Sequence, residues 1–496
     1  MMLPPVIGDL TPLIPAATLL VFAALTLLLG VFTRDRAGLG ALALVGVAAA
    51  LAFGLYLWFT DRAAGVAGSA LSGAYLGDAL AHPLSFVVLL GTGLAVLLAD
   101  GHLDRLELDH PEFHPLLLLA STGALVLVAA GDLVSLLLGL EIMSLAVYAL
   151  ATFRERSRAS EEAGMKYFLL GAFASAVLVY GMALVFGATG RFDLPGIAAA
   201  ATAPGFAAQG LLLLGAVFIL VGLGFKVAFV PFHQWLPDVY TGAPTPVTAF
   251  MSVVVKTAAF AALLRVTGTL FEALGPGPVG EVLPAVLVVL VGLTMVAGNV
   301  GALLQGGVKR LLAYSEVAHA GYLGLAVLAG GRDGVGAASY YLLAYTLTNL
   351  AAFAVLLSLM DADDRGDRLE RFAGLGHRRP WLAAGLAIAM LSLAGFPPFA
   401  GFLAKALVFQ AAIAAGHTAL AVLGIVTAIV AVFFYARVVT TMYLQAPDAH
   451  TPEPRPVGRR TAVVLAVGIA GTVLLGLFPG AWLDLVASTP WWGAGF

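Results

Sequence analysis

Long apolar runs alternate with short connections rich in glycine, proline or charge along almost the whole chain. A helix that crosses a membrane needs about 20 predominantly apolar residues. The pattern therefore predicts fourteen spans, at residues 11–31, 38–59, 83–99, 114–131, 133–152, 164–188, 209–236, 244–270, 284–305, 311–330, 336–360, 381–414, 418–443 and 461–485. The run 381–414 is too long for one straight helix, so we expect it to be interrupted.

The composition places the chain in the membrane class. Of its 496 residues, 61% are hydrophobic and 11% are charged, whereas soluble domains average about 45–50% and about 25%. We therefore expect an all-α polytopic membrane protein. The formal net charge of −3 gives no indication of nucleic-acid binding. The N-terminal sequence MMLPPVIGDLTP has no basic region, so we expect the first apolar run to be a retained helix rather than a signal peptide.

Lysine and arginine are distributed unevenly between the two sides of this topology. If the N-terminus faces outward, 17 of the 25 basic residues fall on inner loops and five fall inside spans. The outer loops carry only Arg62, Arg191 and Arg332. Because loops on the inner side of a membrane are enriched in Lys and Arg, this asymmetry predicts that both termini lie on the outer side, which corresponds to the periplasmic side of a bacterial inner membrane.

Five ionisable residues lie well inside predicted spans, namely Glu141, Lys226, Lys256, His319 and Lys405. A lysine at the centre of a span costs about 2.5–3.5 kcal/mol to insert, so such residues are expected to have a function. The structural alternative is a buried ion pair between Glu141 and Lys226, with His319 as an ordinary core histidine. Arg265 and Arg437 lie near span ends, where a long side chain can reach the membrane surface, and we interpret them as structural.

The spacing of these residues indicates an internal repeat. Glu141 and Lys226 lie on the fifth and seventh spans, and His319 and Lys405 lie on the tenth and twelfth. The interval along the chain is nearly identical in the two pairs. An offset of five spans reverses the orientation, which is typical of an inverted-topology repeat. The predicted units are residues 114–270 and 284–443, flanked by residues 1–113 and 444–496.

Prolines interrupt the seventh and twelfth spans. Pro231 and Pro237 bracket His233, and Pro397 and Pro398 precede Lys405. Proline removes a backbone donor and breaks a helix. At membrane depth, broken backbone survives only where protein or a water-filled cavity satisfies the freed groups. The paired interruptions therefore predict broken helices that line an ion pathway.

Four motifs in this order are specific: GLEIMSLAVYAL, GLGFKVAFVPFHQWLPDVYTGAPTPVTAFMSVVVKTAAF, GVKRLLAYSEVAHAGY and LAGFPPFAGFLAKALVF. They resemble the antiporter-like subunits of respiratory NADH:quinone oxidoreductase, complex I, and within them the subunit N branch. The resemblance covers nearly the whole chain. It implies fourteen helices with two inverted five-helix repeats and broken helices 7 and 12. The sister subunit M carries a glutamate where this sequence has Lys405.

The resemblance also implies a proton pathway, formed by Glu141, Lys226, His233, Lys256, His319 and Lys405. In it, Glu141 is the carboxylate partner of Lys226, and His233 is a polar link beside the first break. Lys256 and His319 belong to a central axis that leads to Lys405. Glu316 departs from the family pattern, which has a small polar residue there, and we expect only a local pairing with Lys309 or Arg310.

Two opposing effects would control the proton on Lys226. Burial favours the neutral amine. A carboxylate about 4 Å away, at an effective dielectric constant near 20, favours the ammonium by about 4 kcal/mol. A small movement of Glu141 could therefore toggle the proton. Moving one charge across the membrane costs about 2.3 kcal/mol per 100 mV, which such a toggle could supply.

No cofactor is expected in this chain. It has no cysteine, which excludes cysteine-ligated iron–sulfur clusters, and it has no nucleotide-binding fingerprint. His110 and His114 have a spacing that could bind metal, but a solvated loop is the simpler interpretation, and a haem on His233 and His319 is a remote alternative. By the resemblance, FMN, iron–sulfur clusters and quinone belong to partner subunits.

The expected partners are protons, the lipid bilayer and other membrane subunits of complex I, including antiporter-like subunit M and small membrane subunits. One alternative is a subunit of a multisubunit cation (sodium)/proton antiporter, which shares these motifs. Another is a structural membrane subunit without a proton path. Lys405 and the GLEIMSLAVY context favour the complex I subunit over the antiporter.

Overall fold

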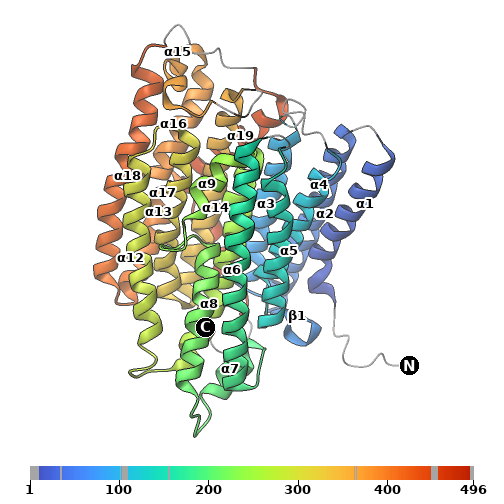
Figure 1. The fold of residues 1–496 in the computed structure, drawn as a ribbon, viewed down its shortest axis with the longest axis vertical. Coiled ribbons are helices and arrows are strands. Elements are labelled where there is room, and N and C mark those ends of the chain that lie inside the picture. Colours follow the sequence, from blue (N-terminus) through green and yellow to red (C-terminus); the bar gives the residue numbers. More distant parts are fainter. Residues whose placement is uncertain are drawn as a thin grey trace.

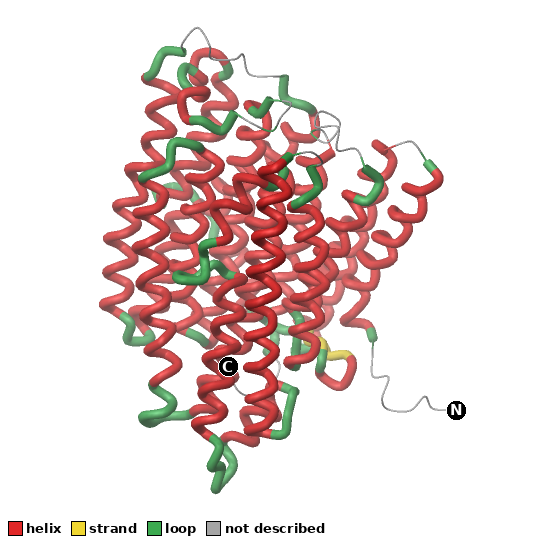
Figure 2. Tube along the Cα trace, in the orientation of Figure 1, coloured by secondary structure: helices red, strands yellow, loops and turns green. Residues whose placement is uncertain are grey.

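The computed structural model describes residues 10–33, 36–100, 102, 110–154, 157–361, 364, 366–447 and 456–491. The described chain is helical apart from a short antiparallel ribbon of β1 (Gly68–Ala70) and β2 (Tyr75–Gly77) (Figure 2). The long helices run side by side along the vertical axis of Figure 1. The described chain is thus mostly helical, as expected of a polytopic helical membrane protein.

The uninterrupted long helices are α1 (Ile14–Phe32), α2 (Arg36–Ala64), α3 (Ala81–Asp100), α4 (Phe113–Val128), α5 (Leu133–Ala151), α6 (Arg158–Thr189), α12 (Val282–Leu303), α13 (Val308–Ala329), α14 (Gly331–Leu359), α18 (Thr418–Leu444) and α19 (Arg459–Leu477). The interrupted segments are α8 (Gln209–Lys226) with α9 (Trp235–Gly242), α10 (Thr245–Phe250) with a π-helical turn and α11 (Lys256–Leu274), and α16 (Pro380–Ala394) with α17 (Ala400–Ala414). Short elements are α7 (Leu194–Ala201), α15 (Leu375–Arg378), α20 (Gly480–Ala487) and the 3₁₀ turns Thr11–Leu13, Leu71–Gly73 and Leu369–Phe372.

Among the described residues, twelve helices are long and apolar enough to cross a membrane. Three more apolar helices, α4, α16 and α17, are shorter. The protein is therefore a multi-pass membrane protein, as its hydropathy pattern indicates. The expected span 209–236 is not one helix, because the chain between α8 and α9 leaves the helical path.

The first interruption has a defined helix end. Ala228 adopts the left-handed conformation, with φ of 60°. The N–H groups of Ala228 and Phe229 donate to the carbonyls of Phe225 and Gly224, which is the hydrogen-bond pattern of a Schellman motif. Farther along, the N–H of Val230 donates to the Thr294 hydroxyl of α12 at 2.9 Å. Neighbouring protein thus satisfies the backbone that leaves the helix, as the interior of a membrane requires.

The second interruption ends in the same way. Gly395, with φ of 93°, and Phe396 donate to the carbonyls of Ser392 and Leu391 at the end of α16. The prolines follow this motif in both segments, so they occupy the non-helical link. Pro237 does not contribute to the first interruption, contrary to its expected role. It lies in the first turn of α9, where a missing N–H costs little.

Close helix contacts depend on glycine at two related places. A Cβ on Gly123 of α4 would lie 2.4 Å from the backbone N of Met143 in α5. A Cβ on Gly298 of α12 would lie 2.3 Å from the backbone N of Ala318 in α13. Only glycine allows backbones to approach so closely, a common packing device in membrane proteins. These two contacts hold α5 and α13, which carry Glu141 and His319, against their neighbours.

The interpretation of Arg265 as a snorkelling residue is wrong. Its side chain is 2% exposed and forms two hydrogen bonds, of 2.8 and 2.9 Å, with Asp78. Burial by itself would raise the pKa of Asp78, but the guanidinium holds it below its usual value. Arg437 is structural as expected, because it donates to the carbonyls of Leu303 and Gln305 at the end of α12.

The two ends of the described chain meet at one end of the helical bundle. The indole N–H of Trp58 in α2 donates to the Thr489 hydroxyl at 2.8 Å, and the N–H of Ala79 donates to the carbonyl of Pro490 at 2.9 Å. The turn that precedes α1 packs against β1 in the same α2–α3 connection. Both ends therefore lie on the same side of the bundle.

Candidate functional site

Three lysines are buried in the interior of the bundle. Lys226, Lys256 and Lys405 are 4%, 3% and 5% exposed. In the described part of the chain, none of the three forms an ion pair with a carboxylate. Hydroxyl groups, backbone carbonyls and tyrosine rings surround the ammonium groups instead. Such an environment can hold a cation without a fixed counter-charge, because oxygen lone pairs and aromatic faces both attract it.

Lys226 is the last residue of α8, directly before the first interruption. Its Nζ donates to the hydroxyl of Ser144 at 2.8 Å and to that of Tyr167 at 3.2 Å. The Nζ also lies 5.3 Å from the ring centre of Tyr148 and 4.9 Å from that of Tyr167. Its position at the carboxyl end of α8 is favourable for a cation, because the helix dipole is negative there.

Glu141 does not contact Lys226, although a direct pair was expected. Its carboxylate is only partly buried and accepts a hydrogen bond of 2.5 Å from Ser175 of α6. Among the residues that the structure describes, no ion pair joins the two groups. Instead, the hydroxyl of Ser144, less than one turn farther along α5, accepts a hydrogen bond from the Lys226 ammonium. The rotation of α5 about its axis explains this, because residues three apart point in directions about 60° apart.

Lys256 is the first residue of α11, directly after the π-helical turn Met251–Val255. Its Nζ donates to the backbone carbonyl of Glu316 at 3.0 Å and lies 4.4 Å from the ring centre of Tyr345. Lys256 thus reaches from the first predicted repeat into α13 and α14. A π turn widens the helix locally and is frequent at functional sites.

Glu316 is not the surface residue that the sequence suggested. It is 5% exposed, and its Oε1 accepts a hydrogen bond of 2.8 Å from the Tyr240 hydroxyl of α9. Lys309 and Arg310, its expected partners, bind Asp364 and Asp238 instead. The expected pairing with Lys309 or Arg310 fails because Glu316 lies about two turns farther along α13 than these residues. Its side chain is on the face of α13 that is turned to the interior.

His319 lies one turn beyond Glu316 on α13. Its Nδ1 is 2.5 Å from the Tyr341 hydroxyl of α14, and its Nε2 is 3.1 Å from the Tyr435 hydroxyl of α18. Tyr435 also contacts the hydroxyl of Ser315. Because both ring nitrogens are engaged by hydroxyls, the imidazole is held in a chain of groups that can each donate and accept a proton.

Lys405 reaches back from α17 to the end of α16. Its Nζ donates to the carbonyls of Leu393 and Ala394, both at 2.9 Å, and lies 5.1 Å from the ring centre of Tyr322. Lys226 and Lys405 differ in sequence, since the prolines follow one and precede the other. In space they are alike, because each ammonium lies at the carboxyl end of the first half of a broken helix, where the dipole favours it.

His233 lies in the first interruption and is partly buried. Its Nδ1 is buried and has no hydrogen-bond partner among the described residues. The structure does not bring His233 into contact with any of the three buried lysines. Its role as a link in the pathway therefore stays a prediction.

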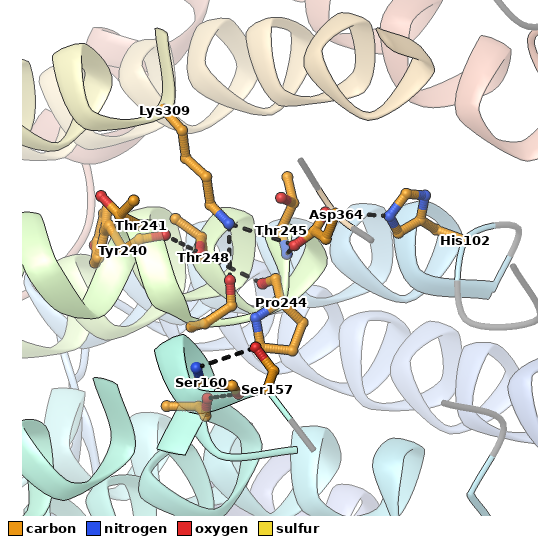
Figure 3. A network of polar contacts seen from close by, with 12 residues as sticks. His102, Ser157, Ser160, Tyr240, Thr241, Pro244, Thr245, Thr248, Lys309 and Asp364 are labelled. Atoms are coloured by element: carbon orange, nitrogen blue, oxygen red, sulfur yellow. Dashed lines mark hydrogen bonds and ion pairs between the residues drawn. The ribbon is translucent and has the colours of Figure 1, made fainter. Parts of the chain in front are cut away.

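A second polar network lies where α9 meets α10 (Figure 3). Lys309, 2% exposed, donates to the carbonyl of Ala243 at 2.7 Å and lies 3.5 Å from the Asp364 carboxylate. His102 approaches Asp364 from the other side at 3.4 Å, and the N–H of Thr245 donates to it at 2.8 Å. Burial by itself would raise the pKa of Asp364, but the nearby Lys309 ammonium and these hydrogen bonds hold it well below its usual range.

Sequence reasoning missed the serine and tyrosine side chains that contact the buried ionisable residues, some through a hydroxyl and some through the ring. These are Ser144, Tyr167, Tyr240, Tyr322, Tyr341, Tyr345 and Tyr435. Tyrosine in an apolar run looks like an ordinary core residue, so composition gives no signal. The motif YSEVAHAGY did hold one, because Glu316, His319 and Tyr322 follow each other at intervals of three and so share a helix face.

Metal binding by His110 and His114 finds no support in the described part of the chain. His114 lies 3.5 Å from Asp100, and the His110 ring packs against Phe153. No group of three or more His, Asp or Glu side chains within the described ranges is placed to hold a metal ion.

Comparison with known proteins gives consistent matches. Residues 130–431 match the family described as NADH:quinone oxidoreductase/Mrp antiporter, transmembrane. The chain is 44% identical over 489 residues to NADH-quinone oxidoreductase subunit N of Deinococcus radiodurans, and the match covers 98% of this chain and 97% of that protein. It is 43% identical over 491 residues to the protein of the same name from Chloroflexus aggregans, again covering 98% and 97%.

Solved structures agree with these relatives. A chain of respiratory complex I from Thermus thermophilus superposes with a TM-score of 0.79 at 38% identity, covering 96% of this chain and 99% of that one. A chain of the Mrp complex from Dietzia sp. has a TM-score of 0.82 at 24% identity, covering 96% of each. At that identity the second likeness establishes a shared fold only.

Proposed function

Because the chain belongs to the NADH:quinone oxidoreductase/Mrp antiporter transmembrane family, we propose that it is the subunit N of a bacterial NADH:quinone oxidoreductase and translocates protons. One observation carries the proposal. Three buried ammonium groups lie beside irregular turns of their helices, a buried histidine lies within α13, and each of the four is hydrogen-bonded to hydroxyls or backbone carbonyls. Unpaired lysines at this depth are costly, and a proton-transfer role explains their presence.

The pathway has four stations along the interior of the bundle. Lys226 with Ser144 and Tyr167 forms the first, and Lys256 at the π turn of helix α10–α11 the second. The third is His319 between two tyrosine hydroxyls, and the fourth is Lys405 at the end of α16. Tyrosine and serine hydroxyls both donate and accept, so they can pass a proton between stations.

Glu141 acts on Lys226 at a distance rather than as a contact partner. Its carboxylate favours the ammonium form of Lys226, and this effect weakens as the two charges separate. If the Glu141 side chain left Ser175 and turned toward Ser144, its carboxylate would come closer to the Lys226 ammonium. This movement would raise the proton affinity of the lysine, and the reverse movement would lower it. The driving free energy comes from electron transfer to quinone, and FMN, iron–sulfur clusters and quinone are bound by partner subunits.

The fold supports an arrangement of fourteen spans with two inverted repeats. The twelve long apolar helices are completed by α4 and by α16 with α17. Matching backbone contacts recur in the two halves of the chain. Leu133 donates to the carbonyl of Phe192, and Val308 donates to that of Asp367, with the same shift in residue number for donor and acceptor. The units are α4 to α11 and α12 to α18, with both ends of the chain on the outer side.

Two substitutions test the function. Lys226→Met and Lys405→Met keep the side-chain length but remove the ionisable group. In the complete enzyme, reconstituted in proteoliposomes, we expect each to lower the rate of proton pumping about tenfold or more, because a positioned proton-transfer group contributes that much. Ser358→Ala is a matched control, since among the described residues that buried hydroxyl donates only to a carbonyl of its own helix.

Pumping at the wild-type stoichiometry in both lysine variants would contradict the proposal. Copurification addresses the alternative of a cation/proton antiporter. We expect the chain to copurify with subunits that contain flavin and iron–sulfur clusters. Its isolation with small antiporter subunits alone would favour the antiporter.

A further inference from the structure

The first step is to define which positions of the two repeats are equivalent. The beginnings of α5 and α13, at Leu133 and Val308, define a constant shift in residue number, called the repeat shift below. Leu194 donates to the carbonyl of Gly131, and Leu369 donates to that of Gly306, so both partners differ by the repeat shift.

Two further kinds of contact obey the repeat shift. It relates the isolated bridge Asp132–Asp193 to the bridge Gly307–Arg368. It also relates the close approach of Gly123 and Met143 to that of Gly298 and Ala318. Backbone pairing and helix packing therefore agree on one alignment of the two repeats.

This alignment changes the pairing of ionisable residues. Spacing along the sequence relates Glu141 to His319. The repeat shift instead relates Glu141 to Glu316, and Ser144 to His319. The two alignments differ by three residues, close to one helical turn. The second repeat therefore has a carboxylate of its own at the position that Glu141 occupies in the first.

Glu316 is more enclosed than Glu141. Glu141 is partly buried between α5 and α6, whereas Glu316 is 5% exposed. Its Oε1 accepts from Tyr240, while its Oε2 is buried without a hydrogen-bond partner among the described residues. A buried carboxylate oxygen that lacks a donor is costly, and such a group in a native protein calls for an explanation.

The groups that face Glu316 come from both repeats. Tyr240 of α9 and Lys256 of α11 belong to the first, and the Lys256 ammonium binds the backbone carbonyl of Glu316 itself. Tyr345 of α14 places its ring against that ammonium. His319 follows one turn later on the same face of α13. Glu316 is thus the group at which the two halves meet.

We propose that Glu316 is a proton-binding site of the pathway, located between Lys256 and His319. The inference rests on the proposed function. In the transfer, an N–H bond of the Lys256 ammonium breaks and an O–H bond forms at Oε2 of Glu316. The products are a neutral amine and a neutral carboxylic acid, so the net charge of the site is unchanged. Since no ion pair joins the two groups in the described structure, rotation of the Glu316 side chain precedes the transfer.

The test compares three variants of the complete enzyme in proteoliposomes. Glu316→Gln keeps the size and the hydrogen bond from Tyr240 but cannot ionise, and we expect proton pumping to fall about tenfold or more. Glu316→Asp keeps a carboxylate and is expected to retain most of the pumping. A purely structural role would give the opposite order, because Gln preserves the shape better than Asp. If Glu316→Gln does not assemble, Glu316→Ser takes its place with the same expectation.

Infrared difference spectroscopy detects protonation of a carboxylate directly, and a change in packing alone does not produce this signal. During turnover we expect a carboxylic acid C=O signal in the wild-type enzyme that is absent from Glu316→Gln and present, at a shifted position, in Glu316→Asp. An unchanged signal in Glu316→Gln would overturn the proposal, as would pumping at the wild-type rate. Pumping that depends on added Na⁺ in the wild type and not in Glu316→Gln would also overturn it, because the site would then bind sodium.

Lys226→Met and Glu141→Gln are measured in parallel. If these two lose pumping and Glu316→Gln does not, only the assignment of Glu316 is wrong. If Lys226→Met and Lys405→Met also pump at the wild-type stoichiometry, the proposed function itself fails, and the two failures are thereby distinguished.

Discussion

Individual ammonium groups in this protein are stabilised by neutral partners. An ammonium over a desolvated aromatic ring gains about 2 kcal/mol, and each hydrogen bond to a charged group contributes about 1.5–3 kcal/mol. Lys226, with two hydroxyl oxygens and two rings around it, offsets much of the cost of its burial in this way. A neutral shell leaves the proton free to depart, whereas a fixed ion pair would retain it.

Asp364 differs from these groups, because it forms a buried ion pair with Lys309 at the edge of the bundle. We expect Asp364→Asn to destabilise the protein at neutral pH by about 3–5 kcal/mol, since the substitution leaves a buried ammonium unpaired. Thermal unfolding of the purified complex measures this loss. The double variant Lys309→Met with Asp364→Asn is the control and should recover most of the stability.

The pH dependence of the same pair has a defined sign. The pKa of Asp364 is below its usual range in the folded protein. Its contribution is therefore complete above the unfolded pKa of about 4 and is lost as the pH falls below that value. The difference between wild type and Asp364→Asn should shrink in the same interval. A difference that stays constant down to strongly acidic pH would contradict the assignment.

At the scale of elements, both helix interruptions have a defined backbone conformation with satisfied hydrogen bonds. Both half-helices end in the same hydrogen-bond motif, and α12 supplies a hydroxyl to the link after α8. The left-handed residue differs between them, since the first has Ala228 and the second Gly395. An alanine in this conformation costs about 1–2 kcal/mol, so the first interruption stores strain that the second does not.

This difference predicts opposite responses to substitution. Ala228→Gly relieves the left-handed strain and loses about 0.5–1 kcal/mol to chain entropy, so we expect stability to be unchanged or slightly increased. Ala228→Val should destabilise by about 1–3 kcal/mol. Ala261→Gly, at a buried position within α11, is the matched control and should cost about 1 kcal/mol. Heat-induced loss of the folded complex ranks the three variants.

Gly395 tolerates substitution less than Ala228, the residue with positive φ in the first interruption. Besides its positive φ, a Cβ at this position would lie 3.1 Å from Cδ of Lys405. The glycine therefore leaves room for the lysine to reach the carbonyls at the end of α16. The absence of a side chain at Gly395 therefore allows both the backbone conformation of the second interruption and the position of the Lys405 ammonium.

The whole molecule is an enclosed axis within a shell of lipid-facing helices. The stretches Thr245–Leu274, Val308–Ala329 and Gly331–Leu359 are buried on nearly all sides, whereas α1, α2 and α19 leave most of their surface exposed. The axis residues come from the enclosed stretches and from the broken helices beside them. A chain of titratable groups is thereby kept away from lipid, which is where such groups are tolerated.

The proposed orientation can be measured, because the chain contains no cysteine. We introduce Ala203→Cys in the α7–α8 connection and His377→Cys in α15, two exposed positions on the proposed outer and inner sides. A thiol reagent that does not cross membranes should label the first in intact cells and the second only after permeabilisation. The reverse pattern would invert the topology, and equal labelling of both in intact cells would contradict the proposed spans.

The sequence by itself determined the apolar segments, the two interruptions and the three interior lysines. Each of these depends on local properties: the length of an apolar run, a proline without a backbone donor, and the cost of burying a charge. The hydropathy pattern also predicted an interruption within 381–414. It assigned Pro237 to the first interruption, whereas Pro237 lies in the first turn of α9.

Only the tertiary structure decided which of these groups meet. Glu141 was expected at Lys226 and binds Ser175, while Glu316 was expected near the surface and faces Tyr240 and Lys256. The physical reason is rotational. A helix that is apolar on all sides has no hydropathy pattern that fixes its rotation about its axis, and one residue changes the direction of a side chain by about 100°. Backbone contacts between helices set that rotation, and with it the order of the groups along the axis.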